Sequence, residues 1–402
     1  MPVLTLADLL HQPDAQSFLR STVASGRFGT AYLFHGPFGV GKGTAAFAFA
    51  RAALCTGRAG AAPDAGGGLF DAVEPAAPGA PADDACGRCP ACKKVAQLQH
   101  PDLKFLFPVS GEEKELDATI AETTEAWRQD PFFVFTYEKA ASIRLSMTRE
   151  LLRELAYKPY EAGRRVVVVR DADRMRDDQC SAMLKSIEEP GASTMWVLTS
   201  ARPARLPATI RSRCQRVRFG PWSEPAIARF LEERVASRPA EARMLAALGC
   251  GSLGRALMLR DQQPLEVRNQ ALALLQPAMR RDGAALLREI QGFNRFGRAG
   301  RETLRRVVEF QELWLRDVLR ARHGATRDML VHRDQEPEIR RQAERVDPTE
   351  IRRRLMALEE ALHSIEGNVT PDLALFSALM RVGDPSFETD AWPAHGAERW
   401  RY

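Results

Sequence analysis

A glycine-rich loop between an apolar run and an alanine-rich run constrains the fold of this 402-residue chain more than any other feature. The loop, residues 36–42 (GPFGVGK), fits the pattern G-x-x-x-x-G-K. It follows the apolar run AYLFH at 31–35 and leads into TAAFAFARAAL at 44–54. A strand, a loop and a helix in this order form the phosphate-binding unit of P-loop proteins. Backbone N–H groups and the helix N-terminus attract phosphate there, and Lys42 is expected to reach the β and γ phosphates.

The residue after the lysine departs from this pattern. Ser or Thr normally stands there and holds Mg²⁺ through its hydroxyl, but here the residue is Gly43. Thr44 comes one residue later, which turns it by about 100° on a helix. The sequence therefore leaves open whether ATP, with or without Mg²⁺, binds at this loop. The candidate binding residues are Gly36, Gly39, Gly41, Lys42, Gly43, Thr44 and Asp171.

Further apolar runs predict an α/β domain. Because strand-like runs alternate with helical segments up to residue 220, we expect a parallel sheet. The expected strands are 103–109, 164–173, 194–200 and 214–219, and the expected helices are 148–157 and 177–190. Two stretches read as insertions: 56–85, dense in Gly, Ala and Pro, and the charged, irregular residues 111–140.

The character of the chain changes after residue 220. From 226 to about 380 the pattern is helical, and the Gly-rich break at 248–254 divides this half. We therefore expect a small helical domain followed by a larger all-α domain. The predicted boundaries are 1–220 for the α/β domain, 221–264 and 265–388 for the two helical domains, and 389–402 for a tail.

The expected strand at 164–173 ends in Asp171-Ala172-Asp173. An ATPase built on this loop needs an Asp to organise Mg²⁺ and an adjacent Glu to polarise the attacking water. Asp171 has the chemistry for the metal, but Ala172 cannot act as a base. Asp173 has the chemistry of a base, yet two positions along it need not face the γ phosphate. The loss of both the hydroxyl at Gly43 and the base predicts that hydrolysis is absent.

Four of the seven cysteines form a candidate metal site. Cys86, Cys89 and Cys92 lie within seven residues, and Cys55 follows the expected helix of the phosphate loop. Four thiolates suit tetrahedral Zn²⁺ in a closed, structural site, whereas the alternative is four reduced thiols without metal. His100 is a spare candidate ligand, although a turn before Pro101 accounts for it as well.

The segment TIRSRCQ at 209–215 contains a candidate catalytic arginine. Arg213 precedes the expected strand 214–219, and a surface cation paired with a carboxylate would account for it. An Arg held at a rigid strand edge can also reach the γ phosphate of a neighbouring subunit as an arginine finger.

Taken together, these motifs resemble the bacterial clamp-loader subunits of the AAA+ class, which belong to DNA polymerase III. The resemblance covers residues 14–260. The residues that carry it are GPFGVGKG at 36–43, the four cysteines, HPD at 100–102, VVVVRDADRM at 166–175, SAMLKSIEEPG at 181–191, LPATIRSRCQRVRF at 206–219 and GSLGRAL at 251–257.

This resemblance implies a P-loop AAA+ domain with a zinc module, a helical lid and an all-α collar that joins subunits. The implied partners are the delta and gamma/tau subunits in a hetero-pentameric ring, with the sliding clamp and primed DNA reached through the assembly. The implied role of Arg213, between Ser212 and Cys214, is an arginine finger acting in trans. Motor subunits carry a lid arginine where this chain has Gly254, with Arg255 one residue later. These departures favour a non-hydrolysing subunit.

Two alternatives stay open at this point. One is an ATP-hydrolysing motor of the gamma/tau type, and the other is a zinc-dependent nucleic-acid-binding protein with a relic P-loop. The net charge of +5 permits contact with nucleic acid without requiring it. With no long apolar run and no signal-peptide pattern at the N-terminus, we expect a cytoplasmic protein without membrane contact.

Overall fold

The computed structural model describes residues 5–58, 81–109, 116–130, 133–135, 141–188, 193–235, 237–260, 264–294, 301–366, 370–384 and 386. These form two compact units, each described by itself below. The first comprises residues up to 135, 141–226 and 252–254, and the second comprises 227–251 and the residues from 255 onwards. The predicted tail 389–402 and most of the insertion 56–85 lie outside the described residues. No described helix is both long and apolar enough to cross a membrane.

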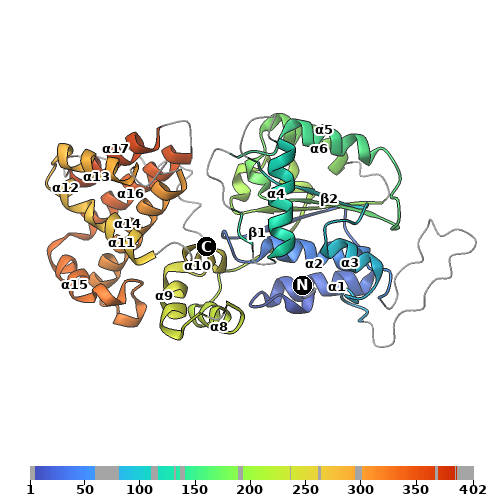
Figure 1. Cartoon of the computed structure of the whole chain (residues 1–402), viewed down its shortest axis with the longest axis horizontal. Helices are drawn as coiled ribbons and strands as arrows, with labels where there is room; N and C mark the ends of the chain where they lie inside the picture. The colour runs from blue at the N-terminus through green and yellow to red at the C-terminus, as the bar shows by residue number, and fades with distance from the viewer. Residues whose placement is uncertain are drawn as a thin grey trace, which may run out of the picture. The chain divides into compact units, whose positions relative to one another are not determined.

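The first unit contains a five-stranded parallel sheet with the strand order β2-β3-β4-β1-β5, as predicted in type (Figure 1). The strands are β1 Ala31–His35, β2 Leu103–Leu106, β3 Arg165–Val169, β4 Thr194–Ser200 and β5 Gln215–Arg218. The helices are α1 Pro13–Ser25, α2 Lys42–Leu54, α3 Pro90–Ala96, α4 Leu116–Gln129, α5 Leu145–Leu155, α6 Asp177–Glu188 and α7 Ala208–Arg213.

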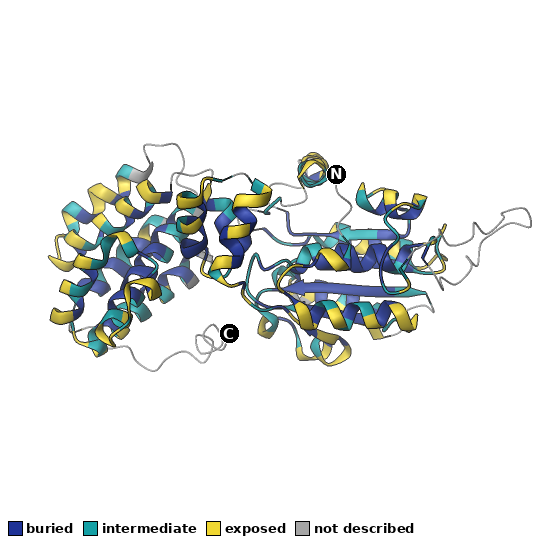
Figure 2. Cartoon of the chain, turned by 90° about the horizontal axis from the view of Figure 1, so that it is seen from below, coloured by how far each residue is buried: buried dark blue, intermediate teal, exposed yellow. Residues whose placement is uncertain are grey.

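Helices cover both faces of this sheet because its strands alternate large apolar side chains between the two sides. On one side, Leu33 and Trp196 belong to a core with Met183 of α6 and Ile210 of α7. On the other side, the rings of Tyr32 and Phe34 lie 5.0 and 6.2 Å from that of Phe49 on α2. All of these side chains are buried, and the central strands β1, β3 and β4 appear mostly dark blue in Figure 2.

The segment expected as an irregular insertion at 111–140 contains a helix, α4, which corrects that prediction. Its apolar residues Leu116, Ile120 and Trp127 recur at helical spacing, but Thr and acidic residues between them hide the pattern in the sequence. The ring of Trp127 lies 4.1 Å from that of Phe47 on α2 and 5.1 Å from that of Phe105 on β2. Tertiary packing of this aromatic group therefore accounts for a helix that local sequence does not announce.

The described part of the second unit is all helical, in agreement with the helical pattern from residue 226. Helix α14 contacts α11, α15, α16 and α17, and thus lies at the centre of the larger helical group. The split into domains 221–264 and 265–388 stays a prediction. The helices are α8 Glu224–Val235, which starts in the first unit, α9 Pro239–Gly249, α10 Leu253–Arg260, α11 Pro264–Ala273, α12 Leu275–Met279, α13 Gly283–Asn294, α14 Arg301–Arg322, α15 Glu336–Arg345, α16 Pro348–Glu366 and α17 Pro371–Gly383.

Candidate functional site

The phosphate loop connects β1 to α2, as the sequence predicts. Gly36, Gly39 and Gly41 all have positive φ angles, of 147°, 71° and 100°, which lets the loop turn tightly before the helix starts at Lys42. The parallel sheet places this loop at the carboxyl ends of its strands, where ligands bind in open α/β sheets. The frame of a phosphate site is therefore present.

Lys42 is turned back onto its own loop. Its Nζ donates hydrogen bonds to the carbonyl oxygens of Gly36 and Pro37, at 2.8 and 2.5 Å, and the side chain is buried. Burial lowers the pKa of Lys42 to about 8, and the nearby charge of Asp171 opposes this shift. The ammonium group is thus satisfied by loop carbonyls in this arrangement.

The space next to Gly43 is occupied by the guanidinium of Arg170. A Cβ added at Gly43 would lie 2.5 Å from Nη1 of Arg170, the residue that follows β3. The Arg170 guanidinium lies 4.0 Å from the centre of the Phe135 ring, and its Nε is 3.5 Å from Oδ2 of Asp171. The side chain that a motor would use to hold Mg²⁺ is absent, and an arginine fills the adjoining space. Nothing in the sequence pattern pointed to Arg170.

The acidic strand end is used for internal contacts. Ala172 is fully buried, and Asp173 accepts hydrogen bonds from Ser200 Oγ at 2.8 Å and from the backbone N–H of Ala201 at 3.3 Å. Arg202 also pairs with Asp173 at 3.3 Å. The carboxylate of Asp173 therefore holds the end of β4.

The polar residues at the end of β4 are engaged in the same way. Thr199 Oγ1 accepts a hydrogen bond of 3.0 Å from the backbone N–H of Asp171, and Ser200 donates to Asp173 as above. Both side chains are buried. These hydrogen bonds hold the ends of β3 and β4 together, so the polar side chains of Thr199 and Ser200 are explained without a bound phosphate.

Gly254, the last residue of the Gly-rich break 248–254, packs directly on the phosphate loop. The backbone N–H of Gly254 donates to the carbonyl of Gly39 at 2.9 Å, and a Cβ on Gly254 would lie only 2.8 Å from Cα of Gly39. A side chain at 254 is therefore excluded by backbone, so the lid arginine of the motors has no room at this position. Arg255 forms an ion pair with Glu309 at 3.1 Å, within the second unit.

Two side chains from outside the phosphate loop, Gln12 and Trp222, form hydrogen bonds to its backbone. The carbonyl of Val40 accepts hydrogen bonds from Gln12 Nε2 at 3.2 Å and from Trp222 Nε1 at 3.3 Å. Gln12 also exchanges two hydrogen bonds with the backbone of Gly220, at 2.8 and 2.9 Å. The loop is thus held by side chains as well as by its own lysine.

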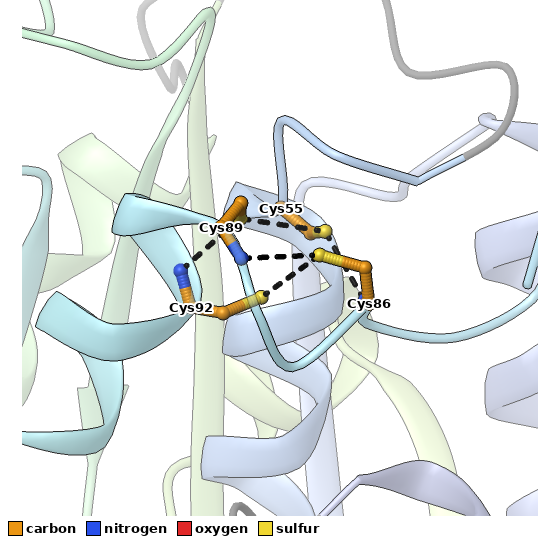
Figure 3. Close-up of side chains that lie close together, drawn as sticks. All are labelled: Cys55, Cys86, Cys89 and Cys92. Carbon is orange, nitrogen blue, oxygen red and sulfur yellow. Dashed lines mark hydrogen bonds between the residues drawn. The ribbon is translucent and has the colours of Figure 1, made fainter. Parts of the chain in front are cut away.

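The four predicted cysteine ligands come together at one point (Figure 3). Cys55 ends α2, Cys89 precedes α3, and Cys92 lies within α3. All four sulfurs lie within 4.8 Å of one another, with Cys55–Cys89 at 3.9 Å and Cys86–Cys92 at 4.0 Å. Sulfurs bound to a tetrahedral zinc ion at about 2.3 Å lie about 3.8 Å apart, so the cluster fits such an ion.

Backbone groups orient these sulfurs. The N–H groups of Cys86, Cys89 and Cys92 donate to the sulfurs of Cys55, Cys86 and Cys89, at 3.3 to 3.4 Å. Without a cation, four thiols at this spacing resist ionising together, and contact with Cys89 raises the pKa of Cys55 to about 12. A divalent cation removes this conflict, because it stabilises each thiolate.

His100, the spare candidate, has a role outside this cluster. Its Nδ1 accepts a hydrogen bond of 3.1 Å from the backbone N–H of Asp102, and burial lowers its pKa. Asp102 is itself fully buried and accepts hydrogen bonds from the backbone N–H groups of 160, 161 and 162. The HPD segment therefore shapes the turn before β2 and anchors the turn before β3.

Arg213 is the last residue of α7 and lies two residues before β5 begins at Gln215, so it precedes a strand as the sequence predicts. Its Nη1 donates to the carbonyl of Thr209 at 2.9 Å, and its Nη2 pairs with Oε1 of Glu188 at 2.7 Å. The side chain keeps 40% of its surface exposed. Because α7 is short and leads straight into β5, the backbone at Arg213 is fixed while the guanidinium stays at the surface.

Comparison with known proteins agrees with these features. The family model described as "DNA polymerase III, delta subunit" matches residues 76–223. The delta-prime subunit of Bacillus subtilis is 26% identical over 361 residues, covering 89% of this chain and 92% of that protein. The delta-prime subunit of Pseudomonas aeruginosa is 30% identical over 256 residues, 63% of each chain.

Two further proteins show more distant similarity to this chain. The tau subunit of Escherichia coli is 27% identical over 64% of this chain, which spans 33% of that protein. A solved gamma subunit-related protein from Thermotoga maritima aligns with 92% of this chain and 98% of its own at 14% identity, with a TM-score of 0.42. The family model and the delta-prime relatives together show that this chain is similar to the delta-prime subunits of DNA polymerase III over most of its length.

Proposed function

We propose that this chain is a non-hydrolysing subunit of the DNA polymerase III clamp loader, which helps to load the sliding clamp on primed DNA. In this proposal it assembles with delta and gamma/tau subunits in a hetero-pentameric ring. Residues 221–264 serve as its lid and 265–388 as its collar. The catalytic contribution of the chain is Arg213, which acts as an arginine finger on ATP bound to a neighbouring motor subunit.

The observation that carries the non-hydrolysing assignment is the contact between Arg170 and Gly43. The guanidinium of Arg170 places a positive charge beside Gly43, the position whose hydroxyl would hold Mg²⁺ in a motor, and like charges in a partly buried site repel each other. Ala172 cannot accept a proton, and Asp173 is committed to Ser200 and Arg202. The motor alternative therefore lacks both the metal-binding hydroxyl after Lys42 and a base.

The placement of Arg213 supports the finger. An arginine finger needs a rigid backbone and a side chain that reaches beyond its own surface. The end of α7 supplies the rigid backbone, since α7 packs against α6 and leads into β5, and the partly exposed guanidinium of Arg213 lies at the surface, from which it can extend. Removal of such a finger lowers turnover by orders of magnitude, because it stabilises charge only in the transition state.

We also propose that the four cysteines hold a structural Zn²⁺. All four positions of a tetrahedral ion are taken by Cys55, Cys86, Cys89 and Cys92, which leaves none for substrate. The third alternative, a zinc-dependent nucleic-acid-binding module, finds little support here. Of the basic residues near the cluster, Lys94 is paired with Glu161 at 2.6 Å, and the cysteine segment CGRCPACKK at 86–94 contains no aromatic residue for base stacking.

The ATPase activity of the purified full-length chain tests the non-hydrolysing assignment. We expect no turnover above that of the Lys42→Ala variant, measured with Mg²⁺-ATP by release of phosphate. Turnover in the wild-type chain that the Lys42→Ala variant lacks would show a working motor and overturn the proposal.

A further inference from the structure

Arg213 does not extend freely from the surface but is held by two neighbours. Its Nη2 pairs with Oε1 of Glu188, the last residue of α6, at 2.7 Å. Its Nη1 donates to the carbonyl of Thr209, four residues earlier in its own helix, at 2.9 Å. The side chain therefore lies back along α7 and towards the end of α6.

We propose that Glu188 is a positioning residue that retracts Arg213, so that the finger must leave this carboxylate before it reaches the phosphate on the neighbouring subunit. This inference rests on the proposed role of Arg213 and adds its regulation. Glu188 itself touches neither ATP nor the reacting atoms.

The exposure of the pair sets its strength. The side chains of Arg213 and Glu188 are 40% and 35% exposed. Ion pairs this accessible to water are weak and screened by salt, because solvent competes for both charges. Such a contact can hold an idle side chain and still yield to a γ phosphate, whose greater charge draws the guanidinium more strongly. The pair is therefore suited to reversible release.

The sign of the effect follows from charge. The Glu188 carboxylate accepts a hydrogen bond from an Arg213 N–H group that would otherwise donate to a phosphate oxygen. Its negative charge also repels the phosphate. Both effects oppose engagement of the finger. Glu188→Gln keeps the shape of the side chain but removes the charge, so it should make engagement easier. For an exposed pair the expected gain is about two- to five-fold.

The experiment uses the clamp loader reconstituted from this chain and the other subunits of its own organism. Steady-state ATPase is measured at saturating Mg²⁺-ATP without DNA, where a retracted finger limits the rate most. We expect Glu188→Gln to raise this rate about two- to five-fold and Glu188→Asp, which keeps the charge, to stay near the wild-type rate. The ratio of the ATPase rate with Glu188→Gln to the wild-type rate should approach one as the salt concentration rises, because salt screens the ion pair.

A matched control is available within the same unit. Arg20 and Asp83 pair at the same 2.7 Å with exposures of 38% and 35%, away from α7. Asp83→Asn therefore removes an equivalent surface charge and should leave the ATPase rate unchanged. If Asp83→Asn raised the rate as much as Glu188→Gln, a general charge effect would replace the specific one.

The double variant Glu188→Gln/Arg213→Ala separates this inference from the proposed function. We expect it to match Arg213→Ala alone, because Glu188 acts through the arginine. If Arg213→Ala lowers the rate but Glu188→Gln does not raise it, the retraction by Glu188 is wrong and the finger stands. If Arg213→Ala itself has no effect, the finger is wrong. If Glu188→Gln raises the rate equally without Arg213, retraction is also wrong.

Discussion

Arg170 lies beside Gly43, so close that a Cβ at position 43 would come within 2.5 Å of its Nη1. This contact joins the end of β3 to the start of α2 and fills the space next to the phosphate loop. The same guanidinium rests on the ring of Phe135 at 4.0 Å. A glycine at 43 and an arginine at 170 thus belong together: the small residue makes room for the cation.

The first prediction concerns metal dependence. Because Arg170 supplies positive charge beside Gly43, which also lacks the hydroxyl that would hold Mg²⁺, nucleotide should bind this chain no more tightly with Mg²⁺ than with a chelator. Titration of the purified chain with a fluorescent ATP analogue under both conditions measures this. Tightening by ten-fold or more on addition of Mg²⁺ would contradict the placement of Arg170.

The second prediction concerns the cysteine cluster. Metal analysis after reducing, chelator-free purification should find one zinc ion per chain. Cys89→Ser should lose it and lower the Tm of the first unit by about 5–10 °C, because a structural site contributes folding free energy directly.

Cys250 provides the control for that measurement, since it is exposed and lies outside the cluster. Cys250→Ser should keep the full zinc content and the wild-type Tm. Substoichiometric zinc in the wild-type chain would count against the four-cysteine site.

The third prediction concerns the contact between Gly254 and Gly39. Gly254→Ala places a Cβ 2.8 Å from Cα of Gly39, and backbone cannot yield as a side chain can. We expect a loss of about 2 kcal/mol or more in the free energy of unfolding, measured with urea. Gly163→Ala, with open space at its Cβ, should change stability by less than about 1 kcal/mol. Equal effects of both variants would remove steric exclusion as the reason for Gly254.

The fourth prediction is a pH dependence from Lys42, whose folded pKa of about 8 lies below its ordinary value of 10.5. Between these values the unfolded chain binds more protons than the folded one, so stability rises with pH from about 8 to 10.5. The rise due to this residue is at most about 3 kcal/mol.

Urea unfolding across this pH range measures that contribution. Lys42→Met removes the titrating group, so its unfolding free energy should lack this part of the rise. Parallel curves for the wild type and Lys42→Met would show that burial of Lys42 does not cost what the pKa shift implies.

The features that depend on local sequence were predictable. Strands β1 and β4 lie at 31–35 and 194–200 as expected, because continuous apolar runs bounded by polar residues are typical of buried parallel strands. The phosphate loop and the cysteine cluster follow from residue types at short, fixed spacings. Cys55 lies 31 residues before Cys86, yet the sequence still pointed to it, because four soft ligands complete a tetrahedral site.

The features that depend on long-range contacts could not be predicted from the sequence. Strand order, the contact of Arg170 with Gly43 and the pairing of Arg213 with Glu188 all join segments far apart in the chain, and no local pattern encodes them. Asp173 has the chemistry of a base, and only its contacts with Ser200, Ala201 and Arg202 assign it to the strand end instead. The sequence thus identified the site residues by their type, but only the folded structure shows how their side chains are oriented.

We propose that this chain acts on ATP only through Arg213, in the site of a neighbouring subunit. The measurement that tests it most directly is the DNA-stimulated ATPase rate of the reconstituted clamp loader, compared between wild type and Arg213→Ala at equal assembly. We predict a fall of at least ten-fold, since an arginine finger stabilises the transition state. A rate equal to that of the wild-type loader would contradict the account.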